Sequence, residues 1–435
     1  MKKVELLAPA GTLKNMRYAF AYGADAVYAG QPRYSLRVRN NDFLEDNLAI
    51  GIKEAHDQGK KFYLTSNLMP HNSKIKTFIN DMRPVIDMGP DALIMADPGL
   101  IMMVRETWPE MPVHLSVQAN TVNYAAVKFW QSVGVERIIL SRELSIDEIA
   151  EIRQQCPDME LEVFVHGALC IAYSGRCLLS GYFNHRDPNQ GTCTNACRWD
   201  YKTTPAEENS EGVVIPKMSD MGDARHPMAD QPVFIEEGKR PGELMPVEED
   251  EHGTYIMNSK DLRAVEHVKK LVEIGVDSLK IEGRTKSHYY VARTAQSYKQ
   301  AINDALEGRE FDTQLLGTLE NLANRGYTDG FYERHHTKEY QNYIQGNSIS
   351  RQQQFVGEIL AYNEDTGLAD IDVKNKFGVG DKLELIKPSG NVDIVLDQMQ
   401  DMYGHNMEQA LGGGYKVRIP LPKDMAELGL IARYL

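Results

Sequence analysis

GADAVYAG, at residues 23–30, introduces a pattern that the chain uses four times. GPDALIMAD (89–97), GVERIILS (134–141) and GVDSLKIEG (275–283) repeat its order of a glycine, a polar residue and a short apolar run. Glycine commonly ends a helix, and a short apolar run between turn signals is typical of a buried strand. Each copy therefore predicts the end of a helix, a turn and a strand.

Four further stretches have the character of strands, which brings the total to eight. They are VELLAPAG (4–11), KKFYLTSN (60–67), VHLSVQAN (113–120) and LEVFVHGA (161–168). Amphipathic stretches of helical length separate most of them, such as 44–58, 75–88 and 122–133. Alternating strands and helices imply parallel pairing, so the sequence predicts an α/β fold, a (β/α)8 barrel of the TIM type. An open doubly wound sheet is the alternative, but no glycine-rich dinucleotide fingerprint follows the first strand.

Composition limits the class of protein. The 435 residues are 25% charged and 42% hydrophobic, and no apolar run reaches the length of a membrane span. The N-terminus has no secretory apolar region, so we expect a cytoplasmic protein without a membrane partner. The net charge of −14 argues against general nucleic-acid binding, so an RNA partner would require a local basic patch. The sequence leaves open whether the chain is a homo-oligomer.

The sequence divides into two domains. We assign residues 1–345 to the barrel, with a long acidic insertion at 201–253 that is rich in Glu, Asp, Pro and Gly. From about residue 350 the pattern changes to short alternating strands separated by glycine-containing turns. Residues 350–435 are therefore predicted to form a small antiparallel β-barrel domain, a type of fold that often holds RNA.

The period of the strands separates apolar side chains, which should face the helices, from polar ones, which should point into the barrel. The last polar residues of the strands should then gather at the carboxyl end of the barrel, where barrel enzymes build their active sites. These residues are Asn67, Asp97, Gln118, Glu143, His166, Lys280 and Glu282.

Four of the five cysteines follow the seventh strand, with spacing C-x6-C-x15-C-x3-C at Cys170, Cys177, Cys193 and Cys197. A reducing cytosol disfavours a disulfide framework, and zinc modules usually contain closer C-x2-C pairs. Thiolate ligands favour either an iron–sulfur cluster or zinc, and the spacing alone leaves both open. The fifth cysteine, Cys156, lies in RQQCPD at a helix end and is not expected to join them.

Two segments of the sequence resemble a known family. EVFVHGALCIAYSGRCLLS (162–180) and RDPNQGTCTNACRW (186–199) are similar to the signature of the collagenase-like peptidase family of unknown catalytic type. LAPAGTLKNMRYAFAYGADAVYAGQPRYSLRVRNN (7–41) and SLKIEGRTKSHYY (278–290) more narrowly resemble its bacterial tRNA-hydroxylating branch. The resemblance runs nearly end to end.

The resemblance implies an enzyme that hydroxylates C5 of the wobble uridine of tRNA. This reaction is the first step towards 5-carboxymethoxyuridine or 5-methoxyuridine; it depends on prephenate as co-substrate and needs no molecular oxygen. The tRNA anticodon region would be the partner. The resemblance also implies a 4Fe-4S cluster on the four grouped cysteines. Other members of the family act on other substrates, so hydroxylation of another RNA base is an alternative.

Basic and polar residues near the predicted barrel mouth suit these substrates. Arginine is the preferred residue for gripping the carboxylates of a dianion such as prephenate. We assign substrate binding to Arg33, Tyr34, Arg37, Arg39, Asn67, Gln118 and Arg284, with Tyr34 as a platform for a base turned out of its stack. Lys286 and Arg293 would add positive charge. Catalytic roles are assigned to His166, Lys280 and Glu282.

Three other classes of function compete with hydroxylation. A peptidase would fit the family resemblance, but the sequence has no H-E-x-x-H zinc site and no G-x-S-x-G nucleophile turn. A Schiff-base aldolase would use Lys280 but leaves the cysteines without a role. An RNA-binding scaffold with a structural metal would explain the C-terminal domain but not the polar barrel mouth.

Overall fold

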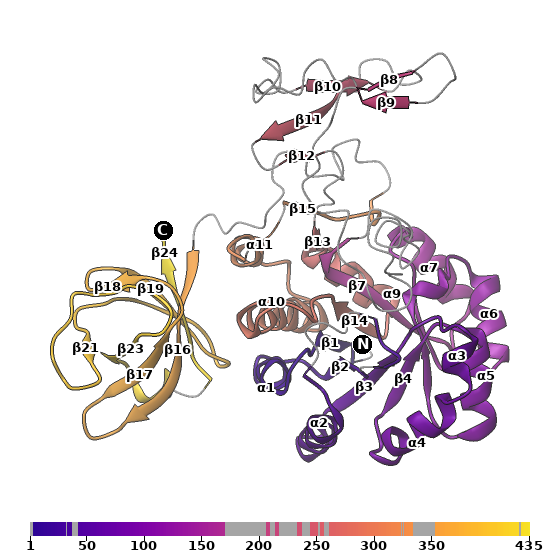
Figure 1. The fold of residues 1–435 in the computed structure, drawn as a ribbon, viewed down its shortest axis with the longest axis horizontal. Coiled ribbons are helices and arrows are strands. Elements are labelled where there is room, and N and C mark those ends of the chain that lie inside the picture. Colours follow the sequence, from indigo (N-terminus) through magenta and orange to yellow (C-terminus); the bar gives the residue numbers. More distant parts are fainter. Residues whose placement is uncertain are drawn as a thin grey trace.

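The computed structural model describes a barrel and a smaller C-terminal sheet that packs against one side of it (Figure 1). The described residues are 3–31, 33–36, 42–169, 261–322, 324, 326–333, 353–425 and 428–435, with the backbone of five short strands between 206 and 255. Among the described residues, no helix is long and apolar enough to cross a membrane.

Eight parallel strands close into a barrel, because β7 pairs with β14 and β14 pairs with β1. The strands are β1 (Glu5–Pro9), β2 (Ala26–Gly30), β3 (Lys61–Ser66), β4 (Ala92–Met95), β5 (Val113–Leu115), β6 (Arg137–Ile139), β7 (Glu160–Ala168) and β14 (Ser278–Ile281). They coincide with the eight predicted strands. The predicted fold class is therefore confirmed.

Helices surround the strands (Figure 1). They are α1 (Leu13–Ala21), α2 (Glu45–Asp57), α3 (Asn72–Ile75), α4 (Phe78–Asp87), α5 (Pro98–Thr107), α6 (Tyr124–Ser132), α7 (Ile146–Gln155), α9 (Val268–Ile274), α10 (His288–Leu306) and α11 (Gln314–Glu320), with short 3₁₀ turns η2 (Val117–Ala119) and η6 (Val265–His267). Their apolar faces and the outward faces of the strands form one large hydrophobic core.

The fourfold repeat has a structural reason. All four of its glycines, Gly23, Gly89, Gly134 and Gly275, have positive φ angles, between 74° and 107°. Glycine adopts this conformation without the penalty that a side chain would bring. In three copies the acidic residue two positions later accepts a backbone N–H from the preceding strand of the barrel: Leu6 donates to Asp25, Phe62 to Asp91 and Leu161 to Asp277. The repeat thus ends a helix and anchors the start of a neighbouring strand.

Additional strands interrupt the barrel pattern after β7. Within the predicted insertion and just beyond it, β8 (Ala206–Glu208) pairs with β9 (Val214–Pro216), and β11 (Leu244–Asp250) pairs with β10 (Val233–Glu236) and β12 (Gly253–Tyr255), all antiparallel. Next, β13 (Asp261–Arg263) pairs antiparallel with the end of β7 and parallel with β15 (Tyr327–Thr328). The end of β7 therefore has neighbours outside the barrel.

The C-terminal strands form a seven-stranded antiparallel sheet with its own hydrophobic core. In spatial order they are β20 (Val392–Val395), β19 (Lys382–Ile386), β24 (Leu430–Tyr434), β16 (Gln353–Asn363), β17 (Leu368–Val373), β23 (Lys416–Pro420) and β21 (Gln400–Asp401). The short strands β18 (Phe377–Gly378) and β22 (Gln409–Ala410) pair separately, and η7 (Lys423–Met425) precedes β24.

Polar contacts join this sheet to helices α1 and α10 of the barrel. Arg293 of α10 is 1% exposed, and its two terminal nitrogens lie 3.2 and 3.0 Å from the carboxylate oxygens of Glu384. The hydroxyl of Tyr22, which follows α1, lies 3.0 Å from the Ile386 carbonyl oxygen and 2.9 Å from that of Leu428. The expectation that Arg293 adds charge to an RNA surface is wrong, because Glu384 holds this arginine inside the interface.

Candidate active site at the carboxyl end of the barrel

A cavity of about 100 Å³ lies at the carboxyl ends of the strands. It is lined by residues from β2, β3, β4, β6, β7 and β14 and from the loops that follow several strands. Five of the residues assigned from the sequence lie together in its wall: Asn67, Gln118, Lys280, Glu282 and Arg284. The strand period therefore located most of the polar residues at the barrel mouth.

One wall of the cavity is a cluster of uncharged polar groups. The side-chain amide of Asn67 donates to Gln118 Oε1 (2.6 Å), and the Ser116 hydroxyl donates to the same oxygen (2.8 Å). Asn67 Oδ1 accepts the backbone N–H of Leu36 (3.2 Å). Gln118 is buried in the 3₁₀ turn η2, which begins two residues after the end of β5 at Leu115. These contacts fix the side chains before any substrate arrives.

An ion pair forms the floor of the cavity. Lys280 Nζ lies 2.7 Å from Glu162 Oε1, and the two side chains are 3% and 0% exposed. Burial lowers the pKa of Lys280, although the charge of Glu162 opposes this shift. The ammonium also lies 4.3 Å from the centre of the Tyr28 ring. Lys280 is thus an interior cation, held in place by its partner from the neighbouring strand.

Arg284 contributes a guanidinium to the wall. It donates to the Ser35 hydroxyl (2.7 Å), the Thr65 hydroxyl (3.1 Å) and the Leu36 carbonyl oxygen (2.8 Å). The guanidinium passes over Gly30, where a Cβ atom would lie 2.6 Å from Arg284 Nη1. A glycine at the end of β2 therefore makes room for this arginine, since real Cβ atoms do not approach so closely.

Arg142 is a second arginine of the cavity, and the sequence analysis missed it. Its guanidinium lies 3.9 Å from the centre of the Phe164 ring, donates to the Ala168 carbonyl oxygen (3.1 Å) and approaches Glu282 Oε2 (3.7 Å). The strand period had selected the next residue, Glu143, which instead accepts a hydrogen bond from Ser141. Because β6 ends at Ile139, its period does not extend to these positions. A basic residue within three positions of a barrel strand's end was the available signal.

His166 does not line the cavity, and the expectation that it points into the barrel mouth is wrong. The register between β7 and β14 shifts between Lys280 and Ile281, so that His166 pairs with Ile281 on the outward phase. Its ring packs among Tyr290, Tyr298 and Tyr327. Burial lowers its pKa to about 3. A β-bulge, which turns every later side chain to the opposite face, is the physical reason.

The arginine-rich loop after β2 is described only in part. Tyr34 is fully buried; its hydroxyl donates to Asp81 Oδ2 (2.5 Å) and its ring packs edge-on against Phe78. The expectation that Tyr34 stacks on an extruded base is wrong, since no face of the ring is open. Arg33 is half exposed and pairs with Asp81 (2.9 Å), away from the cavity wall. Arg37 and Arg39 lie outside the described residues.

The four grouped cysteines, Cys170, Cys177, Cys193 and Cys197, also lie outside the described residues. In the sequence they follow β7, which ends at Ala168. Arg142 of the cavity donates a hydrogen bond to the Ala168 carbonyl oxygen. Cys156, by contrast, ends α7 ahead of the first residue of β7, at the other end of the barrel.

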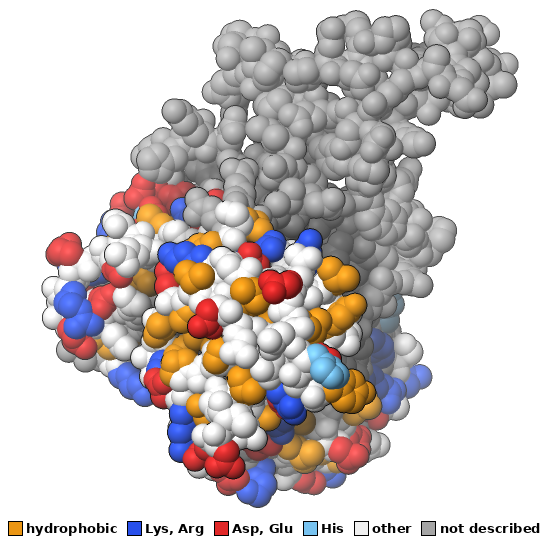
Figure 2. Space-filling view, turned by 90° about the vertical axis from the view of Figure 1, so that its left-hand side faces the viewer, with side chains coloured by type: hydrophobic (Ala, Val, Ile, Leu, Met, Phe, Trp, Pro, Cys, Tyr) orange, Lys and Arg blue, Asp and Glu red, His pale blue; other side chains and the backbone are white. Residues whose placement is uncertain are grey.

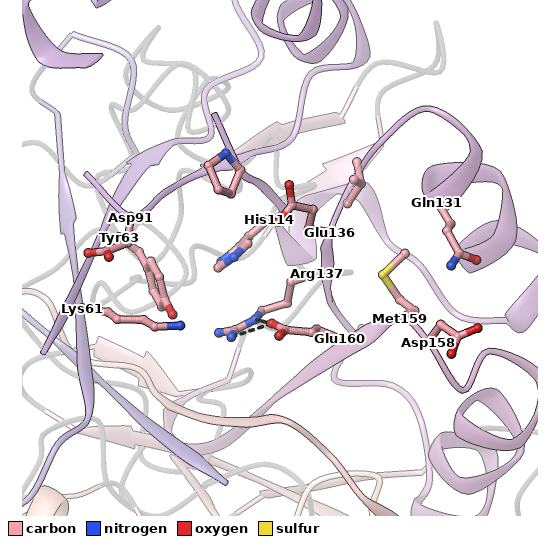
Figure 3. Close-up of a pocket in the computed structure, with 12 residues that line it drawn as sticks. Lys61, Tyr63, Asp91, His114, Gln131, Glu136, Arg137, Asp158, Met159 and Glu160 are labelled. Atoms are coloured by element: carbon pink, nitrogen blue, oxygen red, sulfur yellow. Dashed lines mark hydrogen bonds and ion pairs between the residues drawn. The ribbon is translucent and has the colours of Figure 1, made fainter. Parts of the chain in front are cut away.

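A larger cavity, of about 470 Å³, lies at that opposite end, among residues at the starts of the strands. Figure 3 shows Lys61, Tyr63 and Arg137 converging on its centre. Arg137 is 3% exposed and pairs with Glu5 (2.6 Å), Glu160 (2.7 Å) and Glu162 (3.2 Å). The positive charge of Arg137 is thus neutralised by glutamates of the protein itself. This is expected at the amino-terminal end of a TIM barrel, where residues contribute to stability.

The closed barrel defines a TIM-type protein, and its polar, arginine-lined cavity lies at the carboxyl end of the strands. The chain belongs to peptidase family U32: the model of that family matches residues 11–342, and the model of its C-terminal domain matches residues 351–433. The family resemblance seen in the sequence is therefore confirmed.

Curated relatives cover nearly the whole chain. The tRNA hydroxylation protein P of Escherichia coli is 62% identical over 98% of this chain and 95% of its own length. The protein of the same name from Haemophilus influenzae is 60% identical, over 97% of this chain and 94% of its own. A collagenase of Porphyromonas gingivalis is 27% identical, over 99% and 97% of the two chains.

Proposed function

We propose that this protein hydroxylates C5 of the wobble uridine of tRNA, with prephenate as co-substrate and without molecular oxygen. The observation that carries the proposal is the end-to-end identity, 62% and 60%, with two proteins named for tRNA hydroxylation. The prephenate requirement and the position of the hydroxylated base come from the family resemblance. The cavity at the barrel mouth supports them by its chemistry.

The cavity suits a small dianion. Two guanidinium groups, of Arg142 and Arg284, line the same small volume, with the Lys280 ammonium below them. Arginine grips carboxylates with two parallel hydrogen bonds, and in a site closed to water such contacts are stronger than on a surface. In this proposal the two arginines bind and orient the carboxylates of prephenate, while Asn67 and Gln118 offer amide groups to its hydroxyl or to the base.

Glu282 and Lys280 are the groups in the cavity that can hold or move a proton. The Glu282 carboxylate lies next to the Arg142 guanidinium, and the Lys280 ammonium is backed by Glu162. Because burial lowers the pKa of Lys280, its ammonium gives up a proton more readily than a lysine in water. In this proposal Glu282 positions the substrate through Arg142, and Lys280 donates a proton at the floor of the cavity.

The cofactor of the proposal is a 4Fe-4S cluster held by Cys170, Cys177, Cys193 and Cys197. The donor set fits, since four thiolates in 28 residues are ligands that iron–sulfur clusters prefer. Their segment leaves β7 beside the cavity that Arg142 lines. When bound, such a cluster supplies one-electron chemistry or Lewis acidity that the protein side chains lack.

The C-terminal sheet is the proposed holder of the tRNA arm. On the face of the molecule in Figure 2, lysines and arginines are interspersed with acidic and hydrophobic side chains. In this proposal, phosphate contacts come from individual lysines and arginines of this face and not from a uniform basic surface. We also propose that the protein is cytoplasmic, because tRNA, its proposed substrate, is found in the cytoplasm.

Peptide hydrolysis, which the collagenase relative raises, finds no support in the cavity. Its one serine, Ser116, donates its hydroxyl proton to Gln118, and no described residue of the cavity wall is a histidine or a cysteine. A nucleophilic serine requires a base within hydrogen-bond reach. Lys280 and Glu282 lie in the same wall, but the described hydrogen bonds of the Ser116 hydroxyl are to Gln118 and Asn67 and not to either of them.

Nucleoside mass spectrometry of tRNA tests the proposal. A strain that lacks this gene and any redundant hydroxylase should lose 5-hydroxyuridine derivatives at the wobble position. The wild-type gene should restore them only when the strain also makes prephenate. Restoration by Cys170→Ser, or restoration without prephenate, would contradict the cluster or the co-substrate respectively. Unchanged nucleosides in the deletion strain would contradict the proposed function as a whole.

A further inference from the structure

Three potential metal ligands gather at a place that the proposed function does not use. They are His267, the last residue of η6, and Asp329 and Glu333, which follow β15. One ligand atom from each side chain lies within 4.8 Å of the others. His267 Nε2 is 3.6 Å from Asp329 Oδ2, and His267 Nδ1 is 4.0 Å from Glu333 Oε1.

The histidine of this group points to a ligand. His267 is 7% exposed, and its Nε2 atom is closed to solvent without a hydrogen-bond partner. A buried polar nitrogen without a partner costs free energy, so such groups in native proteins usually bind water or an ion. The nearest carboxylate oxygen, on Asp329, lies just beyond hydrogen-bond distance, which leaves the nitrogen facing an anionic group without contacting it.

We propose that His267, Asp329 and Glu333 bind a divalent transition-metal cation, with water completing its coordination. One imidazole and two carboxylates are the mixed nitrogen and oxygen ligands that Mn²⁺, Fe²⁺ and Zn²⁺ accept. Metal–ligand bonds of about 2.0–2.2 Å place neighbouring ligand atoms about 3 to 3.5 Å apart. One imidazole nitrogen binds one ion, and the three ligand atoms lie within 4.8 Å of one another, so they have to contract by up to about 1.8 Å, and the half-exposed Glu333 side chain can rotate to do so.

The position of this site gives the cation a structural role. Between two of its ligands, Tyr332 donates its hydroxyl to the Phe164 carbonyl oxygen (2.6 Å), and its own carbonyl oxygen accepts the N–H of Ile146 at the start of α7 (3.3 Å). Phe164 belongs to β7 and lines the cavity. A cation at His267 would fix this turn against η6 and so brace the strand that leads to the cysteine segment.

Titration with Mn²⁺ tests the site in anaerobically purified, full-length protein. Mn²⁺ is the probe because thiolates bind this hard cation weakly, so the grouped cysteines do not compete. Loss of the free-ion electron paramagnetic resonance signal should show one bound Mn²⁺ per chain, and Zn²⁺ should displace it. Mn²⁺ should also raise the melting temperature of the wild type.

Substitutions of the three ligands separate the site from its surroundings. His267→Ala and Asp329→Asn should weaken Mn²⁺ binding by more than about tenfold and abolish the rise in melting temperature. Asp147→Asn, which removes an equal charge from an exposed position next to Ile146, should bind as the wild type does. If His267→Ala does not fold, Asp329→Asn and Glu333→Gln decide the question. Absence of Mn²⁺ and Zn²⁺ binding in the wild type, or binding that both of these variants retain, would overturn the proposal.

Discussion

Glu162 and Lys280 face each other across neighbouring strands inside the barrel, 2.7 Å apart and almost closed to solvent. Glu162 also accepts a hydrogen bond from Arg137 (3.2 Å), which pairs in turn with Glu5. A line of alternating charges thus runs through the barrel, from the larger cavity at one end to the candidate site at the other.

Removal of one partner should leave the other charge buried. We expect Glu162→Gln and Lys280→Met each to lower the free energy of unfolding by about 3–5 kcal/mol, because the remaining ion keeps its desolvation cost. Denaturant unfolding measures this. The exposed pair of Lys382 and Asp393 is the control, and Lys382→Met should cost less than about 1 kcal/mol. Equal losses for the buried and the exposed pair would show that the barrel interior admits water.

The two arginines of the cavity, Arg142 and Arg284, should determine how tightly the protein binds prephenate. Arg142→Lys and Arg284→Lys keep the charge but lose the two-point grip on a carboxylate. We expect the prephenate concentration for half-maximal tRNA modification to rise about tenfold to a hundredfold, with tRNA affinity unchanged. Arg33→Lys is the matched control, because Arg33 pairs with Asp81 away from the cavity wall. Wild-type behaviour of both cavity variants would place the anion elsewhere.

Tyr34 should matter for stability and not for recognition of the base. Tyr34→Leu removes a buried ring and its hydrogen bond to Asp81, so we expect a loss of about 2–4 kcal/mol in unfolding free energy. Tyr34→Phe, which keeps the ring, should lose about 1 kcal/mol. Well below its melting temperature, the leucine variant should modify tRNA at the wild-type rate. A Tyr34→Leu variant that is as stable as the wild type but modifies tRNA slowly would contradict this prediction and support a stacking role for Tyr34.

His166 should make the protein sensitive to acid. Its pKa is about 3 in the folded protein and about 6.5 when unfolded, so the unfolded chain takes up the proton first as the pH falls. The full stability is present above pH 6.5 and is lost progressively towards pH 3.

The variant His166→Phe should remove this loss. At pH 5 it should resist unfolding better than the wild type by about 2 kcal/mol relative to their difference at pH 7. Denaturant titrations at both pH values measure the effect, and His71→Phe, at an exposed position, is the control. An unchanged pH dependence in the His166 variant would show that another group carries the acid sensitivity.

The barrel was predictable because its signals are local. The glycine of each repeat is required by a positive φ angle, and in three copies the acidic residue two positions later binds the preceding strand. A few neighbouring residues therefore determine where the helix ends and the strand starts. The inward phase of β14 likewise placed Lys280 and Glu282 at the mouth.

The errors at the site have non-local causes. His166 left the expected face because of a register shift between β7 and β14, strands more than 100 residues apart in the sequence. Tyr34 looked exposed in a basic loop, but Phe78 and Asp81, more than 40 residues later, cover it. Arg142 escaped notice because the strand before it ends early. Period and composition do not show which segments pack on one another, and that packing decides the direction of a loop side chain.

The contact of Tyr22 with Ile386 and Leu428 has a consequence for the order of biosynthesis. Ile386 and Leu428 follow Tyr22 by 364 and 406 residues in the sequence. During translation the newly made barrel therefore waits with the outer face of α1 uncovered and with Arg293 without Glu384. This intermediate resembles the product of deleting residues 350–435, which leaves a buried cation without its counter-ion. Such a deletion therefore removes part of the barrel's own support, and point variants on the outer surface of the sheet are the cleaner way to separate RNA binding from folding.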